Sequence, residues 1–359
     1  MRGAVLYGPR DVRFEERDAP KILKPTDAII RLSATCVCGS DLWPYRGVNP
    51  TARPTPMGHE YCGIVEDVGS AVRGIKPGHF VIGSFFASDN TCPICRAGYQ
   101  SSCQHAELIG GAQAPLLRLP LADGTVVGTR DVPTEQLIPS LLALSDVMGT
   151  GWFAADAARV KPGMSVAVVG DGAVGLLAVL SAKLMGAERI IAMSRHESRQ
   201  TLAREFGATD IVAERGDEGV ERIKDMTKGI GADAVMECVG TQQSMLQAIR
   251  STRRGGYISY VGVPHGVQLD GEQMFFSHVH LHGGPAPVRR FLPNLIELVY
   301  DGKINPGKVF DLTLPLDQVA EGYRAMDERR AIKTLLRPWR RSNGESMAER
   351  GTAQDRSDR

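Results

Sequence analysis

The sequence predicts an α/β protein in which a doubly wound parallel sheet is inserted into a β-rich domain. In the middle of the chain, short apolar runs alternate with amphipathic segments of helical length, the order typical of a parallel sheet covered by helices. We expect strands at 166–169, 190–193, 211–212, 234–238 and 257–261, and helices at 173–185, 197–206, 219–227 and 243–252. The first 150 residues are instead rich in glycine, proline and short β-type runs, which is typical of an irregular β domain.

These patterns predict where the domains begin and end. At 359 residues the chain is long for a single core. We expect residues 1–149 to form the first part of the β-rich domain and 150–284 the nucleotide-binding domain. Residues 285–339 should return to the first domain. Residues 340–359 are polar and poor in apolar side chains, so we expect a disordered tail.

Composition excludes several classes of partner. The formal net charge is +1, so neither nucleic acid nor an anionic membrane surface is expected as a partner. No apolar run approaches the roughly 18 residues of a membrane span, and the N-terminus lacks the pattern of a secretory signal. We therefore expect a cytoplasmic protein. In that compartment the seven cysteines are better interpreted as thiols and metal ligands than as disulfides.

A glycine-rich turn marks the nucleotide site. The run Gly170-Asp171-Gly172-Ala173-Val174-Gly175 follows an expected strand and opens an expected helix. In that context the glycines allow a tight turn, close approach of the backbone to a pyrophosphate, and close packing of helix on strand. The start of the helix supplies free N–H groups for the phosphates. The alternative is an ordinary glycine-rich turn of an α/β protein.

The end of the second expected strand indicates which nicotinamide cofactor binds. An NAD site of this kind usually has an acidic residue about 20 residues after the third glycine. Ser194 stands there instead, followed by Arg195 and Arg199. With no carboxylate at this position, two guanidinium groups can bind a 2′-phosphate. The pattern favours NADP(H) over NAD(H), unless the arginines are simply a solvated helix start.

A candidate metal site lies near the N-terminus. Cys38 and His59 are zinc-type ligands, and a catalytic zinc usually takes three protein ligands with one position open. Asp146, just before the expected domain change, is our first choice for the third ligand. Glu60 and Cys62 are rivals on local spacing. A buried cysteine or a hydrogen-bonded core histidine is the ordinary alternative for each residue alone.

A longer pattern surrounds these residues and resembles the signature of the zinc-containing alcohol dehydrogenases of the medium-chain dehydrogenase/reductase family. The matching motifs are Gly58-His59-Glu60-x-x-Gly63-x5-Gly69-x-x-Val72, Cys38-Gly39-Ser40-Asp41, the run at 170–175, Val261-Gly262-Val263-Pro264 and Arg330-Ala331-Ile332-Lys333. The resemblance implies a chaperonin-10-like β-rich catalytic domain and a Rossmann domain. It also implies catalytic Zn²⁺ held by Cys38, His59 and Asp146, with Glu60 as a carboxylate that can exchange onto the metal.

The same resemblance extends to a second cysteine cluster. Cys92, Cys95 and Cys103 have the spacing of the family's structural zinc lobe, but Asp89 stands where the first of four cysteines is expected. Aspartate can ligate zinc, so a structural zinc site of three cysteines and one aspartate is chemically sound. The alternative is a reduced, metal-free loop.

The resemblance also assigns roles around the substrate. Ser40 should carry the proton between the substrate oxygen and the outside. Many relatives continue this relay through a histidine three residues later, where this chain has Trp43. Trp43, Phe85 and Val263 resemble an apolar pocket lining, and Val261 and Val263 should contact the cofactor.

The expected activity is that of a zinc-dependent alcohol dehydrogenase, or aldehyde or ketone reductase, that transfers hydride between a small-molecule alcohol and NADP(H). Alternatives are a zinc-independent quinone or enone reductase on the same fold, a polyol- or threonine-type dehydrogenase using NAD, and a non-catalytic NADPH-binding protein. We expect a homodimer or homotetramer joined near 257–263 and 278–283. His278, His280 and His282 alternate with apolar residues on an expected strand, so we do not assign a third metal site to them.

Overall fold

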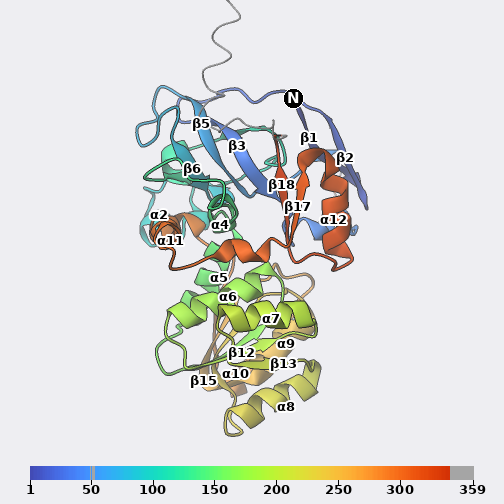
Figure 1. Cartoon of the computed structure of the whole chain (residues 1–359). Helices are drawn as coiled ribbons and strands as arrows, with labels where there is room; N and C mark the ends of the chain where they lie inside the picture. The colour runs from blue at the N-terminus through green and yellow to red at the C-terminus, as the bar shows by residue number, and fades with distance from the viewer. Residues whose placement is uncertain (49, 51–52, 340–359) are drawn as a thin grey trace, which may run out of the picture.

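Two large sheets of different construction form the centres of the two domains (Figure 1). The computed structural model describes residues 1–48, 50 and 53–339. The blue N-terminal strands and the red C-terminal segment lie together at one end, and the green and yellow elements form the other end. The tail expected to be disordered, 340–359, lies outside the described residues. In the described part, no helix has both the length and the apolarity needed to cross a membrane.

The larger sheet of the first domain has seven strands in the order β10-β6-β5-β3-β18-β17, with β9 also paired to β3. Its strands are β3 (Ala28–Cys36), β5 (Tyr61–Val68), β6 (Phe80–Gly83), β9 (Leu116–Leu119), β10 (Val126–Gly128), β17 (Leu312–Pro315) and β18 (Thr334–Arg337). Strand β18 runs antiparallel to β3, so the end of the described chain completes a sheet that the beginning started. The first domain therefore contains segments from both ends of the chain.

Smaller elements surround this sheet. Three strands form a second sheet: β1 (Arg2–Gly8), β2 (Asp11–Glu16) and β4 (Thr55–Pro56). Strands β7 (Phe86–Ala87) and β8 (Glu107–Leu108) pair with each other. The helices are α1 (Leu42–Tyr45), α2 (Pro93–Arg96), α3 (Ala122–Thr125), α4 (Ile138–Leu144) and α12 (Val319–Asp327), with 3-10 turns at Gln100–Ser102, Pro306–Val309 and Leu316–Gln318.

The second domain is a parallel six-stranded sheet in the order β13-β12-β11-β14-β15-β16, which is the Rossmann order. Its strands are β11 (Ser165–Val169), β12 (Arg189–Met193), β13 (Asp210–Val212), β14 (Ala232–Glu237), β15 (Thr252–Tyr260) and β16 (His280–Gly283). Helices α6 (Ala173–Leu184), α7 (Glu197–Phe206), α8 (Gly216–Met226), α9 (Gln242–Ser251) and α10 (Gly271–Ser277) connect them. The strands and helices expected between 166 and 261 are thus confirmed to within a few residues.

Two helices join the domains. Helix α5 (Val147–Ala157) runs without a break across the boundary expected at residue 149, and α11 (Val288–Tyr300) packs beside it. The close approach of α5 to α6 depends on Gly151, because a Cβ there would lie 2.7 Å from the backbone of Ala178. One apolar core continues from α4 through α5 and α11 to β11, so the domains share buried side chains.

One local expectation was wrong. His278 does not lie on a strand: it ends helix α10 in a left-handed conformation, with φ +54°. His280 and His282 lie on β16, where His280 stacks on Tyr257 and His282 meets Phe153 edge-on. Ring contacts therefore account for these two histidines. Within the described residues, they belong to neither of the two clusters with metal-ligand geometry.

Candidate zinc and nicotinamide site

A cleft of about 1040 Å³ lies between the two domains. Its lining includes Cys38, Ser40 and His59 from the first domain and the turn at 170–174 from the second. This side of the Rossmann sheet is the carboxyl end of its strands, where open α/β sheets bind ligands. The cleft therefore places a nucleotide site next to the candidate metal ligands.

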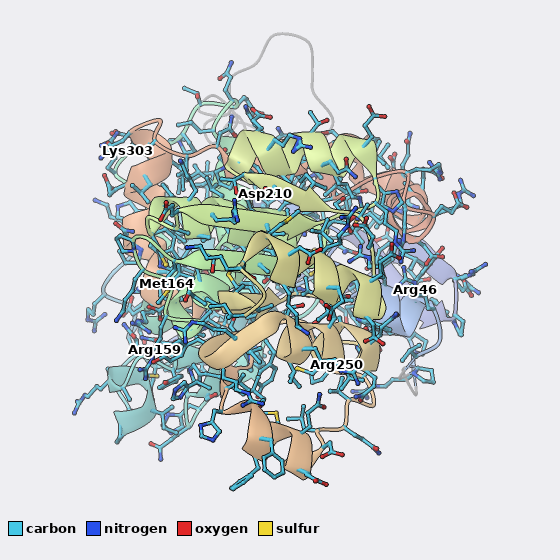
Figure 2. All side chains as sticks on the ribbon, turned by 90° about the horizontal axis from the view of Figure 1, so that it is seen from below. Arg46, Arg159, Met164, Asp210, Arg250 and Lys303 are labelled. Carbon is cyan, nitrogen blue, oxygen red and sulfur yellow. The ribbon has the colours of Figure 1, made fainter. Side chains whose placement is uncertain are left out.

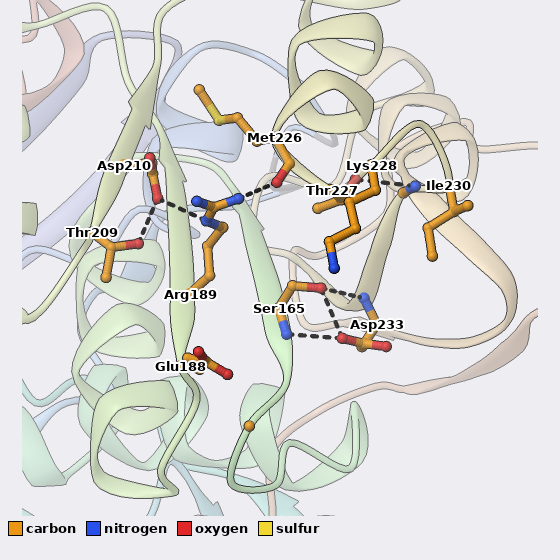
Figure 3. Close-up of a pocket in the computed structure, with 12 residues that line it drawn as sticks. Ser165, Glu188, Arg189, Thr209, Asp210, Met226, Thr227, Lys228, Ile230 and Asp233 are labelled. Atoms are coloured by element: carbon orange, nitrogen blue, oxygen red, sulfur yellow. Dashed lines mark hydrogen bonds and ion pairs between the residues drawn. The ribbon is translucent and has the colours of Figure 1, made fainter.

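A second hollow of about 680 Å³ opens at the opposite, amino ends of the same strands (Figure 3). Some of its polar groups are paired within it: Arg189 lies 3.4 Å from Asp210, and Asp233 accepts from Ser165. In the view from below, Asp210 lies among the Rossmann elements, and the blue ribbon of the first domain shows beside them near Arg46 (Figure 2). We assign no ligand to this hollow.

The candidate catalytic ligands converge from three segments. Cys38 follows β3, His59 precedes β5, and Asp146 caps the start of α5. Asp146 Oδ2 lies 3.5 Å from Cys38 Sγ and 3.3 Å from His59 Nε2. Bond lengths of 2.0–2.3 Å put ligand atoms of a tetrahedral zinc about 3.3–3.8 Å apart, so both separations suit one shared ion.

The surroundings of the cluster also suit a cation. Glu60 is fully buried with its ligand oxygens in the same group, and its Oε2 has no hydrogen-bond partner in the described part of the chain. Burial, and after it the carboxylates of Asp146 and Glu60, raise the pKa of the Cys38 thiol to about 11. A thiolate at this position therefore needs a nearby positive charge, which a zinc ion would supply.

Neighbouring side chains hold the ligands in place. Asp41 Oδ1 lies 3.4 Å from His59 Nδ1, and its other oxygen accepts from the backbone N–H of Cys38. Burial opposes the charged form of the His59 ring, but Asp41 and the other acidic neighbours outweigh it and raise its pKa well above the usual value. Thr150 donates to Asp146 at 2.7 Å. Such outer contacts fix the orientation of metal ligands.

A buried ion pair restrains Glu60. Lys333, from the segment before β18, is 1% exposed, and its Nζ lies 2.6 Å from Glu60 Oε1. The same ammonium donates to the carbonyl of Val37, next to the ligand Cys38. Lys333 and Asp41 belong to the family-like motifs, but the sequence alone assigned no role to either of them or to Thr150. By contrast, the rival ligand Cys62 lies inside β5 and packs in the apolar core.

The second cluster lies in a separate lobe. The ligand atoms of Asp89, Cys92, Cys95 and Cys103 all lie within 4.8 Å of one another. Backbone N–H groups of Gln104 and Cys95 lower the pKa of the Cys92 thiol to about 7, which favours the thiolate that binds metal. Asp89 also contacts His105 Nδ1 at 2.7 Å, so the carboxylate that replaces the fourth cysteine has a partner of its own.

The nucleotide turn has the shape that its glycines predict. Gly170 has φ +121°, which favours glycine, and a Cβ on Gly175 would lie 2.0 Å from the Gly170 carbonyl oxygen. A Cβ on Gly172 would meet nothing within 4 Å, so the cleft side of this turn is open to a ligand. Ala173 opens the 12-residue helix α6, and the start of this helix lines the cleft, where its free N–H groups can bind phosphate. Val261 and Val263 line the same cleft.

The region around Ser194, which the sequence predicts to select the cofactor, differs from the prediction in one respect. A carboxylate does reach it: Asp171, from the glycine-rich turn, accepts from Ser194 Oγ at 2.8 Å. Arg199 pairs with that carboxylate at 3.3 Å and is therefore already engaged. Sequence spacing missed this contact because Asp171 comes from the first turn and not from the second strand. Arg195 is exposed in this region, and Arg215, which the sequence did not single out, lines the cleft as well.

The proposed pocket residues line the same cleft as the metal cluster. The ring of Phe85 meets His59 edge-on at 6.1 Å, and Trp43 lies against His265 of the Rossmann domain with ring centroids 3.9 Å apart. Trp43 thus touches both domains at the cleft. Further apolar side chains in the lining are Phe86, Leu108, Val147, Val263 and Ala286.

Comparison with known proteins agrees with this geometry. The family model described as alcohol dehydrogenase GroES-like domain matches residues 24–140, and that described as zinc-binding dehydrogenase matches 173–299. The probable zinc-binding alcohol dehydrogenase of Mycobacterium tuberculosis is 36% identical over 94% of this chain and 89% of its own. The chain belongs to the zinc-containing alcohol dehydrogenases of the medium-chain dehydrogenase/reductase family. This family membership makes it a zinc- and nicotinamide-dependent oxidoreductase.

Two further similarities extend over almost the whole dehydrogenase chain. Zinc-type alcohol dehydrogenase B of Aspergillus flavus is 33% identical over 94% of this chain and 81% of its own. The solved alcohol dehydrogenase TADH of Thermus sp. superposes with a TM-score of 0.86 at 30% identity, covering 94% of this chain and 99% of that one. The two-domain architecture is therefore that of the family.

The metal assignment makes a direct prediction. Replacing Cys38 by Ser, or His59 by Ala, should lower kcat/KM by at least about a thousandfold, because several kcal/mol of Lewis-acid stabilisation would be lost. Binding of the reduced nicotinamide cofactor, followed by its fluorescence, should stay close to that of the parent enzyme, since the nucleotide turn lies on the other domain. Unchanged turnover in either variant would contradict the assignment.

Proposed function

We propose that this dehydrogenase interconverts small hydrophobic alcohols and their aldehydes or ketones with NADP(H). The observation that carries the proposal is the convergence of Cys38, His59 and Asp146 at the floor of a cleft whose other wall is the nucleotide turn. When bound, zinc would supply Lewis acidity toward the substrate oxygen, and the nicotinamide would accept or donate the hydride. The zinc-independent enone reductases have no use for this ligand set.

The protein's own residues then divide the remaining work. Ser40 lies two residues after Cys38 in the cleft lining, and we assign to its hydroxyl the transfer of the substrate proton. With Trp43 in place of a histidine, no imidazole follows three residues later to continue the relay. Asp41 and Thr150 hold His59 and Asp146 in orientation, and Lys333 holds Glu60 beside them.

The lining supports a hydrophobic substrate. Trp43 and Phe85 line the cleft together with Phe86, Leu108 and Val147, and the ring of Phe85 meets that of the candidate ligand His59. A polyol would have to leave several hydroxyl groups without partners against these surfaces, which costs about 1–3 kcal/mol for each group. An alcohol with an aliphatic or aromatic substituent would instead remove apolar surface from water.

We also propose that the cofactor is NADP(H). Arg195 and Arg215 face the corner where the adenosine ribose of a Rossmann-bound dinucleotide lies, and neither has an ion-pair partner among the described residues. Asp171 does not oppose this choice strongly, because Arg199 neutralises it. We assign Arg195 and Arg215 to the 2′-phosphate, and Ser194 and Arg199 to positioning of the turn.

We further propose that the enzyme is a homo-oligomer joined through the edge of the Rossmann sheet. Strand β16 is the last strand of that sheet, and the adjacent helix α10 contains no buried residue. Phe275 and Phe276 on α10 are 72% and 61% exposed. Large exposed aromatic side chains beside an open sheet edge are typical of an interface.

The activity can be tested by following absorbance of the reduced nicotinamide over a panel of alcohols and carbonyl compounds with both cofactors. Apolar primary and secondary alcohols should be oxidised with NADP⁺ at rates well above those of polyols or L-threonine. Reduction of enones with no alcohol oxidation, or efficient turnover of polyols with NAD⁺, would contradict the proposal.

The cofactor assignment predicts a selective loss. Arg195→Ala and Arg215→Ala should each raise the KM for NADP⁺ about tenfold or more, since a charge-assisted hydrogen bond contributes about 1.5–3 kcal/mol. The KM for NAD⁺ should change little. Arg222→Ala is a matched control, because that guanidinium is exposed on α8 and pairs with Glu214. Equal losses with both cofactors would refute the assignment.

A further inference from the structure

Arg329 reaches from the catalytic domain to the nucleotide corner of the Rossmann domain. It follows helix α12, lines the interdomain cleft, and places Nη1 3.4 Å from Nε2 of His196. His196 stands at the start of α7, directly after Arg195. Because a guanidinium can only donate, the imidazole nitrogen is the acceptor. One arginine of the catalytic domain therefore lies beside the segment expected to select the cofactor.

The backbone at Arg329 is unusual for a residue with a side chain. The N–H of Arg330 bonds to the Ala325 carbonyl and that of Arg329 to the Met326 carbonyl, which is a Schellman motif at the end of α12. Arg329 occupies the left-handed position of this motif, with φ +60°, where glycine is the usual residue. The backbone conformation at this helix end favours glycine, so the presence of arginine at this position must be explained by what its side chain does.

The charges around Arg329 supply that explanation. Its acidic neighbours are engaged elsewhere: Asp327 pairs with Arg46 at 2.6 Å, and Glu328 with Arg330 at 2.7 Å. Arg329 has no ion pair among the described residues. Burial lowers the pKa of Arg215; the carboxylate of Asp171 opposes this effect, and Arg195 and Arg329 lower the pKa further.

Three guanidinium groups that form no ion pair within 4.0 Å among the described residues thus line one cleft, and Asp171, the carboxylate that acts on Arg215, is itself paired with Arg199. Neighbouring positive charges repel one another, and a doubly charged phosphate bound among them would offset this repulsion. A nicotinamide dinucleotide without the 2′-phosphate offers no such charge at this corner.

We infer that Arg329 is a specificity-determining residue that binds the 2′-phosphate of NADP(H) from the catalytic domain. The inference rests on the proposed NADP(H) preference and extends it across the cleft. The phosphate is then held by Arg195 and Arg215 on one domain and by Arg329 on the other. The 2′-phosphate therefore ties the two domains together, whereas NAD(H) lacks this tie.

The left-handed backbone at Arg329 allows a test with a variant that should keep its folding stability. Arg329→Gly removes the side chain at a position that favours glycine, so its melting temperature should equal or exceed that of the parent enzyme. Its dissociation constant for NADPH, measured by fluorescence titration, should rise about tenfold. The constant for NADH should stay within about twofold. Arg330→Ala is the matched control: it removes the adjacent arginine, which pairs with Glu321 and Glu328, and should leave both constants unchanged.

The outcomes separate this inference from the proposed cofactor. If the parent enzyme prefers NADPH but Arg329→Gly binds it as tightly as the parent does, Arg329 does not bind the phosphate and the inference fails alone. An equal loss of NADPH and NADH would also overturn it, because the side chain would then contact a group that both cofactors share. If the parent enzyme binds NADH as tightly as NADPH, the cofactor proposal and the inference fail together.

Discussion

The contact on which the structure depends is the meeting of Cys38, His59 and Asp146 at the junction of the two domains. A buried thiol and a buried carboxylate meet a partly buried imidazole there, beside the buried Glu60. Burial of so many acidic groups is unfavourable unless positive charge compensates it. Lys333 supplies part of that charge, and a zinc ion would supply the rest. Because Asp146 caps α5, the helix that continues into the Rossmann domain, the same contact also fixes where the cofactor cleft lies.

The fold was predictable to an unequal degree in its two halves. In the Rossmann domain each strand and helix can be predicted from its own local pattern. Gly170 and Gly175 belong to a short motif whose turn leaves no room for a side chain at these positions. The catalytic domain depends instead on pairings between distant segments, such as β18 with β3, which no local pattern contains. His278 was misplaced because alternation with apolar neighbours does not distinguish a strand from a short helix ending in a left-handed residue.

The site followed a similar rule. Ligand candidates came from motifs, but the groups that support them, Asp41 and Lys333 among them, acquire meaning only when folding places them next to a ligand. At the cofactor corner, the sequence located Arg195 and missed both the carboxylate of Asp171 and the guanidinium of Arg329. Asp171 belongs to another turn and Arg329 to the other domain, so spacing from the third glycine could locate neither. If Arg329 binds the cofactor as proposed, both domains and not one strand end select it.

The most direct test of the central claim is an anomalous difference map recorded at the zinc absorption edge from crystals of the purified enzyme. A zinc ion held by these three ligands should give a peak at the domain junction within about 2.0–2.3 Å of Cys38 Sγ, His59 Nε2 and an Asp146 oxygen. The absence of a peak there, with these side chains turned away from one another, would contradict the claim, whatever metal the separate cysteine lobe contained.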